Sequence, residues 1–323
     1  MMNIKKIAVL GAVSVMLGAG LHATNAAADV SVMIPAGPGG GWDGTGRQAF
    51  GAMNAAGIYT DGVSFTNTGG AGGTIGLAAF QNSEKGKADA LAVFGAITVG
   101  SIMLNSSPID LSTYTPIARL TAEHLVIAVD SRSEIQTLEQ LVTALKENTG
   151  AVPVGGGSAG GVDHIALALL AQAADIPVAD LNYIPQTSGA ETVTGIVNGT
   201  LVAGISGISE FVPFEEQDRI RILGITSAER HASLPDVATF KEAGFDVEIA
   251  NWRGILGAPD MPADNAAEWV ARFDALNDSD AWAQVLQTQG WDGFYLSGPA
   301  FGDFIAAENE RIGDILKGAG LIE

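Results

Sequence analysis

Two glycine-rich turns near the start of the chain have the residue types and spacing to bind an anion. The first, PAGPGGGWD, runs from Pro35 to Asp43, and the second, NTGGAGGTIG, runs from Asn67 to Gly76. Each follows a short β-branched run and precedes a segment of helical character. Glycine lets the main chain approach a ligand closely, and the first N–H groups of a helix lack intrahelical partners. Together the turns could hold one carboxylate from both sides, although each could also be only a tight connection.

The residues that end the first turn have two open interpretations. Trp42 could shield a ligand or pack in a hinge, and Asp43 could contact a ligand or cap the helix that follows. Arg47 lies one helical turn beyond Asp43, so the two side chains could form an ion pair.

A third glycine-rich stretch, Gly155 to Gly160, matches two catalytic or cofactor patterns at once. As G-x-G-x-x-G it resembles a dinucleotide fingerprint, with Asp175 or Asp180 about 20 residues further on. As G-x-S-x-G it resembles a nucleophile elbow with Ser158 as the nucleophile. Stretches this rich in glycine produce such matches by chance, so we keep an exported serine hydrolase as the alternative and rank a dinucleotide enzyme below it.

The histidines offer little further chemistry. Only His164 and His231 follow Ser158 in the chain and could act as its base. No histidine pair has the spacing of a metal-ligand set, and the chain contains no cysteine. The sequence therefore predicts no metal, no cofactor, no disulfide and no thiolate chemistry.

The N-terminus and the overall charge indicate an exported protein. Met1–Ala28 reads as a secretory signal with a basic start, an apolar stretch and an A-x-A cleavage site, so Asp29 is the expected mature N-terminus. The simplest destination is a bacterial periplasm. The formal net charge of −20 over 323 residues argues against nucleic acid and anionic membranes as partners.

Strand-like and helix-like segments alternate over most of the chain, which predicts an α/β fold with mostly parallel strands. From Ala263 onward the pattern turns helical. The clearest expected strands are 30–34, 63–65, 90–95, 114–120, 125–129, 151–154, 181–184, 201–205 and 220–225, and the clearest helices are 74–81, 137–147, 162–174, 191–197, 266–276, 281–289 and 299–316.

An ordered set of motifs resembles the solute-binding proteins of tripartite tricarboxylate transporters, the TctC or Bug family. The set covers nearly the whole mature chain. It departs from the family at 184–188, where IPQTS replaces the usual V-P-Y-K-G, and at Val202-Ala203, where members usually carry an aspartate. The matching segments are 35–43 with Arg47, 67–76, 155–164, Ile184-Pro185, Asn198-Gly199, 223–230, 234–244, Trp252-Arg253-Gly254 and Ala258-Pro259.

The resemblance implies a type II periplasmic binding fold, with two α/β lobes and a ligand cleft between them. Residues 1–28 are the signal peptide, residues 29–127 and 253–323 form domain 1, and residues 128–252 form domain 2. The expected protein is a non-enzymatic monomer. It captures a small organic di- or tricarboxylate and delivers it to the membrane subunits of the transporter.

The expected ligand contacts divide between the two domains. Domain 1 is expected to hold one carboxylate through its glycine turns, and domain 2 is expected to read the far end of the ligand. The domain 1 residues are Gly39, Gly40, Gly41, Trp42, Asp43, Gly70, Ala71, Gly72, Gly73 and Thr74. The domain 2 residues are Ser158, His164, Gln186, Ser188 and Ser206.

Overall fold

The computed structural model describes residues 30–318 and 320–323. The predicted signal peptide and the expected mature N-terminus at Asp29 lie outside these residues. None of the helices in the described part of the chain is long and apolar enough to cross a membrane.

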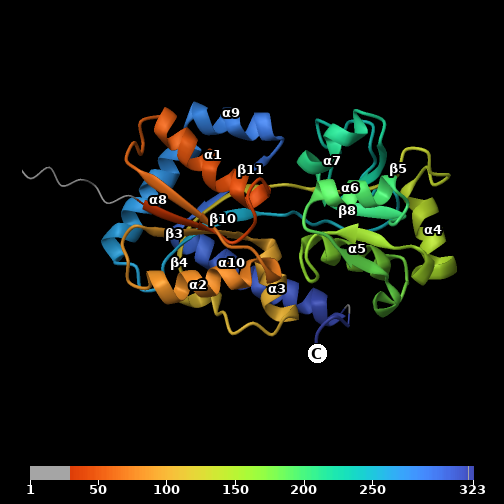
Figure 1. Cartoon of the computed structure of the whole chain (residues 1–323), viewed down its shortest axis with the longest axis horizontal. Helices are drawn as coiled ribbons and strands as arrows, with labels where there is room; N and C mark the ends of the chain where they lie inside the picture. The colour runs from red at the N-terminus through yellow and green to blue at the C-terminus, as the bar shows by residue number, and fades with distance from the viewer. Residues whose placement is uncertain (1–29, 319) are drawn as a thin grey trace, which may run out of the picture.

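The first lobe is built on a six-stranded sheet (left in Figure 1). Its strand order is β11-β4-β10-β3-β1-β2. The strands are β1 (Val30–Ile34), β2 (Val63–Asn67), β3 (Ala90–Gly95), β4 (Thr115–Ala122), β10 (Arg253–Gly257) and β11 (Asp292–Ser297).

Six helices cover the two faces of this sheet. The helices α1 (Gly41–Ala55), α8 (Ala263–Asn277) and α9 (Asp280–Gln289) pack together on one face, and α2 (Thr74–Glu84), α3 (Ala96–Leu104) and α10 (Gly298–Gly318) cover the other (Figure 1). Short 3-10 turns occur at Ala71–Gly73 and Leu111–Thr113. The central strand β3 is buried along its whole length, as a strand covered on both faces must be.

The second lobe has a five-stranded sheet in the order β7-β6-β8-β5-β9. Its strands are β5 (Leu125–Asp130), β6 (Val154–Gly156), β7 (Tyr183–Pro185), β8 (Ala203–Gly207) and β9 (Ile220–Ile225). The helices are α4 (Leu138–Asn148), α5 (Val162–Ala173), α6 (Gly189–Val197) and α7 (Ile208–Glu215), with 3-10 turns at Thr149–Ala151 and Val178–Asp180. The apolar residues of α6 and α7 pack on the face of the sheet opposite to that covered by α4 and α5.

Two crossing segments join the lobes and are hydrogen bonded to each other. The N–H of Glu123 donates to the carbonyl of Asn251 at 3.1 Å, and the N–H of Asn251 donates back at 2.8 Å. His124 and Ala250 continue this antiparallel pairing. All of β5 pairs within the second sheet, so the boundary expected after residue 127 falls inside a strand of the second lobe.

The expectation of mostly parallel strands is wrong, because both sheets are mixed. The pairs β1–β2, β1–β3, β6–β7 and β6–β8 are parallel. The pairs that involve β4, β5 and β10 are antiparallel. These are the strands that carry the chain between the lobes and back, so their direction opposes that of their neighbours. The sequence also missed β11, which lies between two helices.

The lobes also touch through small residues. A Cβ on Gly100 of α3 would collide with the carbonyl oxygen of Gly160, and a Cβ on Gly160 would lie 2.7 Å from Leu104. A Cβ on Gly161 would lie 3.2 Å from Ile97. The turn before α5 therefore rests directly against α3 of the other lobe.

Trp252 lies in the second crossing segment and packs into the core of the first lobe, so replacing it tests how much this packing stabilises the protein. Its ring packs against Phe94 and Phe301, and its indole N–H donates to Glu308 at 2.9 Å. We expect Trp252→Ala to lower the free energy of unfolding by about 3–5 kcal/mol, as for other large buried side chains. Urea unfolding beside Ile75→Ala, which truncates an exposed side chain, checks this. Equal losses in the two variants would contradict it.

Candidate functional site

Six strand-to-helix connections meet where the lobes face each other. In the first lobe β1, β2 and β3 lead into α1, α2 and α3, and in the second lobe β6, β7 and β8 lead into α5, α6 and α7. Ligands of open α/β sheets bind at such carboxyl ends of strands. The contact between α3 and the turn before α5 brings one such connection from each lobe together.

The two glycine turns of the first lobe lie side by side. Gly69 faces the other turn so closely that a Cβ there would lie 3.3 Å from the nitrogen of Gly37. The Asn67 amide joins the turns, because its Nδ2 donates to the carbonyl of Ala36 at 3.1 Å and to Asp43 Oδ1 at 3.0 Å. The structure therefore brings together the two segments in which the first-lobe site was expected.

Asp43 holds the first turn in place. Its Oδ2 accepts from the N–H of Gly39 at 3.0 Å, and its Oδ1 accepts from Arg47 Nε at 2.8 Å, so the expected pair with Arg47 is present. Burial raises the pKa of Asp43, but the hydrogen bonds from Gly39, Asn67 and Arg47 outweigh it and lower the pKa below its ordinary value. The carboxylate is ionised and already engaged by three donors.

Gly72 and Gly73 form the closest approach of the second turn to the rest of the lobe. Their φ angles are +62° and +92°, values that residues with a side chain adopt only with strain. A Cβ on Gly72 would overlap Ser101 of α3. One on Gly73 would lie 2.6 Å from the Trp42 ring and 3.2 Å from Thr98 Oγ1.

Around this approach lies a set of buried polar groups from the first lobe with no hydrogen-bond partner among the described residues. We call them the unpaired donors: Trp42 Nε1, Thr98 Oγ1, Ser101 Oγ, and Nε and one terminal nitrogen of Arg253. Each of these side chains is at most 6% exposed. Buried polar groups are almost always paired, so this concentration indicates a place where a ligand supplies the acceptor.

Arg253 is the cation of this set and is held by Glu123. A terminal nitrogen of Arg253 contacts Glu123 Oε2 at 2.5 Å, while Glu123 Oε1 accepts from the N–H of Ser209 at 2.6 Å. Both side chains are nearly inaccessible. The pair therefore links β10, the first crossing segment and the N-terminus of α7 in one buried contact.

The sequence missed most of these groups. Thr98 and Ser101 lie inside a strongly apolar segment that reads as core, and Glu123 stands between two strand-like runs. Their position could have indicated a site, because Thr98 and Ser101 lie three residues apart, on one face of a helix that directly follows β3. Trp42 was expected at the site, and Arg253 was part of a motif without an assigned contact.

Three of the side chains expected to contact the ligand in the second lobe, those of His164, Ser188 and Ser206, have partners within the protein. His164 Nδ1 accepts from the N–H of Gly160 at 3.1 Å, and its ring stacks on Tyr183 with centroids 4.2 Å apart. Ser188 caps α6 by accepting from the N–H of Glu191 at 3.2 Å. Ser206 donates to Glu210 at 2.5 Å, and the backbone of Gln186 pairs with Gly156.

Burial lowers the pKa of His164, so its imidazole is neutral near pH 7. Ser158 lies half-buried in the turn before α5, and its carbonyl accepts from the N–H of Gly161 at 2.8 Å. His231, the other candidate base for a hydrolase, lies beside Asp292 with its Nδ1 at 2.7 Å from Ser233.

Asp163, which the sequence did not single out as a site residue, is the most perturbed carboxyl group of the second lobe. Its Oδ2 accepts from the N–H of Gly157 at 2.6 Å. Burial, together with the charges of Glu210 and Glu123, raises its pKa to about 7, although Gly157 and Arg253 act in the opposite direction. The charges of the buried pair of Arg253 and Glu123 therefore influence the protonation of Asp163.

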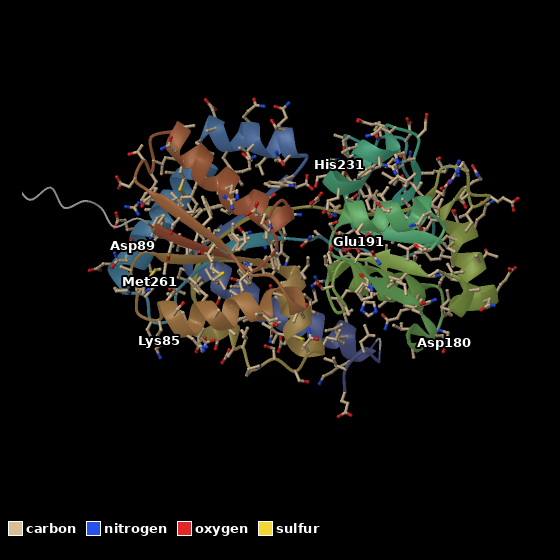
Figure 2. The ribbon with its side chains drawn as sticks, in the orientation of Figure 1. Lys85, Asp89, Asp180, Glu191, His231 and Met261 are labelled. Atoms are coloured by element: carbon tan, nitrogen blue, oxygen red, sulfur yellow. The ribbon has the colours of Figure 1, made fainter. Side chains whose placement is uncertain are left out.

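Two hollows lie elsewhere, and none of the expected site residues lines either. One, of about 870 Å³, spans both lobes beside the crossing segments, where His124 and His231 approach Asp292 at 3.7 and 3.8 Å. Figure 2 places His231 on the side of the second lobe toward the first. The other, of about 550 Å³, lies between α3 and α10. Among residues 30–318 and 320–323, no three acidic, histidine or cysteine side chains are arranged to hold a metal ion.

The raised pKa of Asp163 predicts a pH-dependent stability. The folded protein binds this proton more tightly than the unfolded chain, whose pKa is near the ordinary 3.8. The free energy of unfolding should therefore fall as the pH rises from about 4 to about 7. Urea unfolding between pH 4 and 8 measures this, and the free energy of unfolding should fall less in Asp163→Asn than in the wild type. The control is Glu139→Gln at the exposed start of α4, which should behave like the wild type. An unchanged slope in Asp163→Asn would refute it.

Known proteins resemble this chain in sequence and in fold. A UPF0065 protein from the tcbD–tcbE intergenic region of Pseudomonas sp. (strain P51) is 28% identical over 206 residues, which span 61% of this chain and 59% of that protein. MatC from Rhodopseudomonas palustris, solved with bound malate, has a TM-score of 0.76 at 20% identity, covering 89% of this chain and 98% of its own. Rpa4515 from R. palustris, solved with adipate, has a TM-score of 0.81 at 19% identity, covering 90% and 97%.

These folds confirm the expected two-lobed arrangement of a periplasmic binding protein. The family described as the tripartite tricarboxylate transporter family receptor, TctC, matches residues 47–321, which include the second glycine turn, α3, both crossing segments and all of the second lobe. The chain therefore belongs to the TctC family of receptors.

Proposed function

We propose that this protein is a monomeric periplasmic receptor that captures a small organic carboxylate between its lobes and delivers it to the membrane subunits of a tripartite transporter. The observation that carries the proposal is the set of unpaired donors beside the two glycine turns. An indole N–H, two hydroxyls and a guanidinium are the groups that bind a carboxylate well. The family match and the relatives solved with malate and adipate support the same class of ligand.

In this proposal the first lobe grips the carboxylate. Trp42, Thr98 and Ser101 surround the approach of Gly72 and Gly73, and Arg253 supplies the positive charge. Binding would give these buried groups the acceptors that they lack within the protein. The proposal assigns no catalytic role to Ser158, because a receptor returns its ligand unchanged.

The first test combines a ligand screen with a variant of the second turn. A ligand that binds only the folded state at one hundred times its dissociation constant stabilises it by about 2.7 kcal/mol. We expect thermal shifts with small carboxylates, but not with the matching primary amides. In Gly72→Val the new side chain would overlap Ser101, so calorimetric titration should detect no binding while the far-UV spectrum stays native. Wild-type affinity in folded Gly72→Val would exclude this site.

A second test separates binding from stability. Thr98→Val keeps the shape of the side chain but removes a hydroxyl that has no partner, so the free energy of unfolding should stay constant or rise. Carboxylate affinity should fall about tenfold, the scale of one hydrogen bond to a charged group. The control is Thr239→Val, which removes a hydroxyl that accepts from the N–H of Glu242. Thr239→Val should lower the free energy of unfolding and leave carboxylate affinity unchanged. If Thr98→Val also lowers stability without changing affinity, the proposal is wrong.

A further inference from the structure

The helices that face each other across the lobes differ in how their N-termini are occupied. In the second lobe, protein carboxylates accept from the backbone at the starts of α6 and α7 and from the turn that precedes α5. Asp163 binds the turn before α5, Glu210 approaches the N–H of Gly189 at the start of α6 at 3.4 Å, and Glu123 binds the N–H of Ser209 in α7. The protein's own anions therefore fill the positions where a ligand carboxylate would otherwise bind.

The first lobe differs at α2 and α3, whereas Asp43 engages the turn before α1 as Asp163 engages the turn before α5. The first turns of α2 and α3 contain no acidic residue, and the only acidic residue in the first turn of α1, Asp43, accepts from its own turn. The partnerless buried groups at the site, Trp42 Nε1, Thr98 Oγ1, Ser101 Oγ and the nitrogens of Arg253, all belong to this lobe. The first lobe thus offers donors, and the second lobe offers acceptors.

The two arrangements meet across the lobes, because the turn that binds Asp163 rests against α3 and because Glu123 contacts Arg253. The charges of Glu210, Glu123 and Arg253 all act on Asp163, although Arg253 belongs to the other lobe. His164 and Tyr183 pack beside Asp163, but His164 is neutral and the Tyr183 hydroxyl donates to the carbonyl of Gly157 at 2.9 Å. Besides Arg253, which already pairs with Glu123, no cation faces the second-lobe carboxylates among these described neighbours.

We propose that the second lobe selects a carboxylate whose far end donates hydrogen bonds, an ammonium or a hydroxyl group, in preference to one that ends in a second carboxylate. This rests on the proposed function and narrows its ligand. A second carboxylate would be repelled by Glu210 and by ionised Asp163, whereas an ammonium or hydroxyl group finds acceptors there. Where the sequence led us to expect a di- or tricarboxylate, this proposal favours an amino or hydroxy acid.

The test is a calorimetric comparison of ligands matched in length, from three to six carbons. Each set contains the unsubstituted monocarboxylate, its ω-hydroxy and ω-amino forms, and the dicarboxylate, for example butyrate, 4-hydroxybutyrate, 4-aminobutyrate and succinate. At the best length, we expect the donor-bearing ligands to bind at least about tenfold more tightly than the dicarboxylate. Glu210→Gln should reduce this preference, while Glu139→Gln, the same change at an exposed site in the same lobe, should leave it intact.

Proton exchange gives an independent readout. An ammonium beside Asp163 favours its ionised form, so binding at pH 7 should release protons, whereas a second carboxylate should cause uptake. Titrations in buffers of different ionisation enthalpy measure this, and Asp163→Asn should abolish the release. Tighter binding of dicarboxylates with proton uptake would overturn the inference and leave the proposed function standing. Failure of folded protein to bind any carboxylate would overturn both.

Discussion

The buried contact between Arg253 and Glu123 is the interaction on which the interlobe region depends. Charges taken out of water are costly unless each is paired and hydrogen bonded. Glu123 meets this condition through Arg253 and the N–H of Ser209, whereas Arg253 has nitrogens left without a partner. Both carboxylate oxygens of Glu123 are therefore paired, which ties Glu123 to the second lobe. Arg253 keeps nitrogens that are free to bind a ligand next to the glycine turns. Because Glu123 lies in the first crossing segment and Arg253 begins β10 directly after the second, the charge that serves the site also stabilises the hinge.

The need to pair buried polar groups also explains why the two lobes differ in their free hydrogen-bonding groups. A helix N-terminus attracts whichever anion is nearest, and in the second lobe that anion is a side chain of the protein. In the first lobe the glycine turns bring the backbone against α3 without a side chain between them. Two lobes with similar strand-to-helix connections therefore differ in the hydrogen-bonding groups that they present toward each other.

Sequence patterns predicted the local features well. The expected spans of β1 and β3 match the structure, and those of β5 and α5 lie within one residue of it. The glycine turns lie where they were expected, because turn chemistry depends on adjacent residues. The direction of the strands could not be read locally, since it follows from how the chain crosses between lobes. β11 is short, partly exposed and irregularly paired with β4, which weakens its pattern. Thr98, Ser101 and Glu123 gain their significance only from groups far away in the sequence.

The hydrogen-bonded crossing segments act as a fulcrum. Since Glu123 and Asn251 are tied to each other by two backbone bonds, the lobes cannot slide independently along the two segments. Relative motion is reduced to bending and twisting of one narrow ribbon. The hollow beside this ribbon is lined by both lobes, so its width is tied to the angle between them. His231 belongs to the second lobe and Asp292 begins β11 of the first lobe, so the separation of these two residues follows the angle between the lobes.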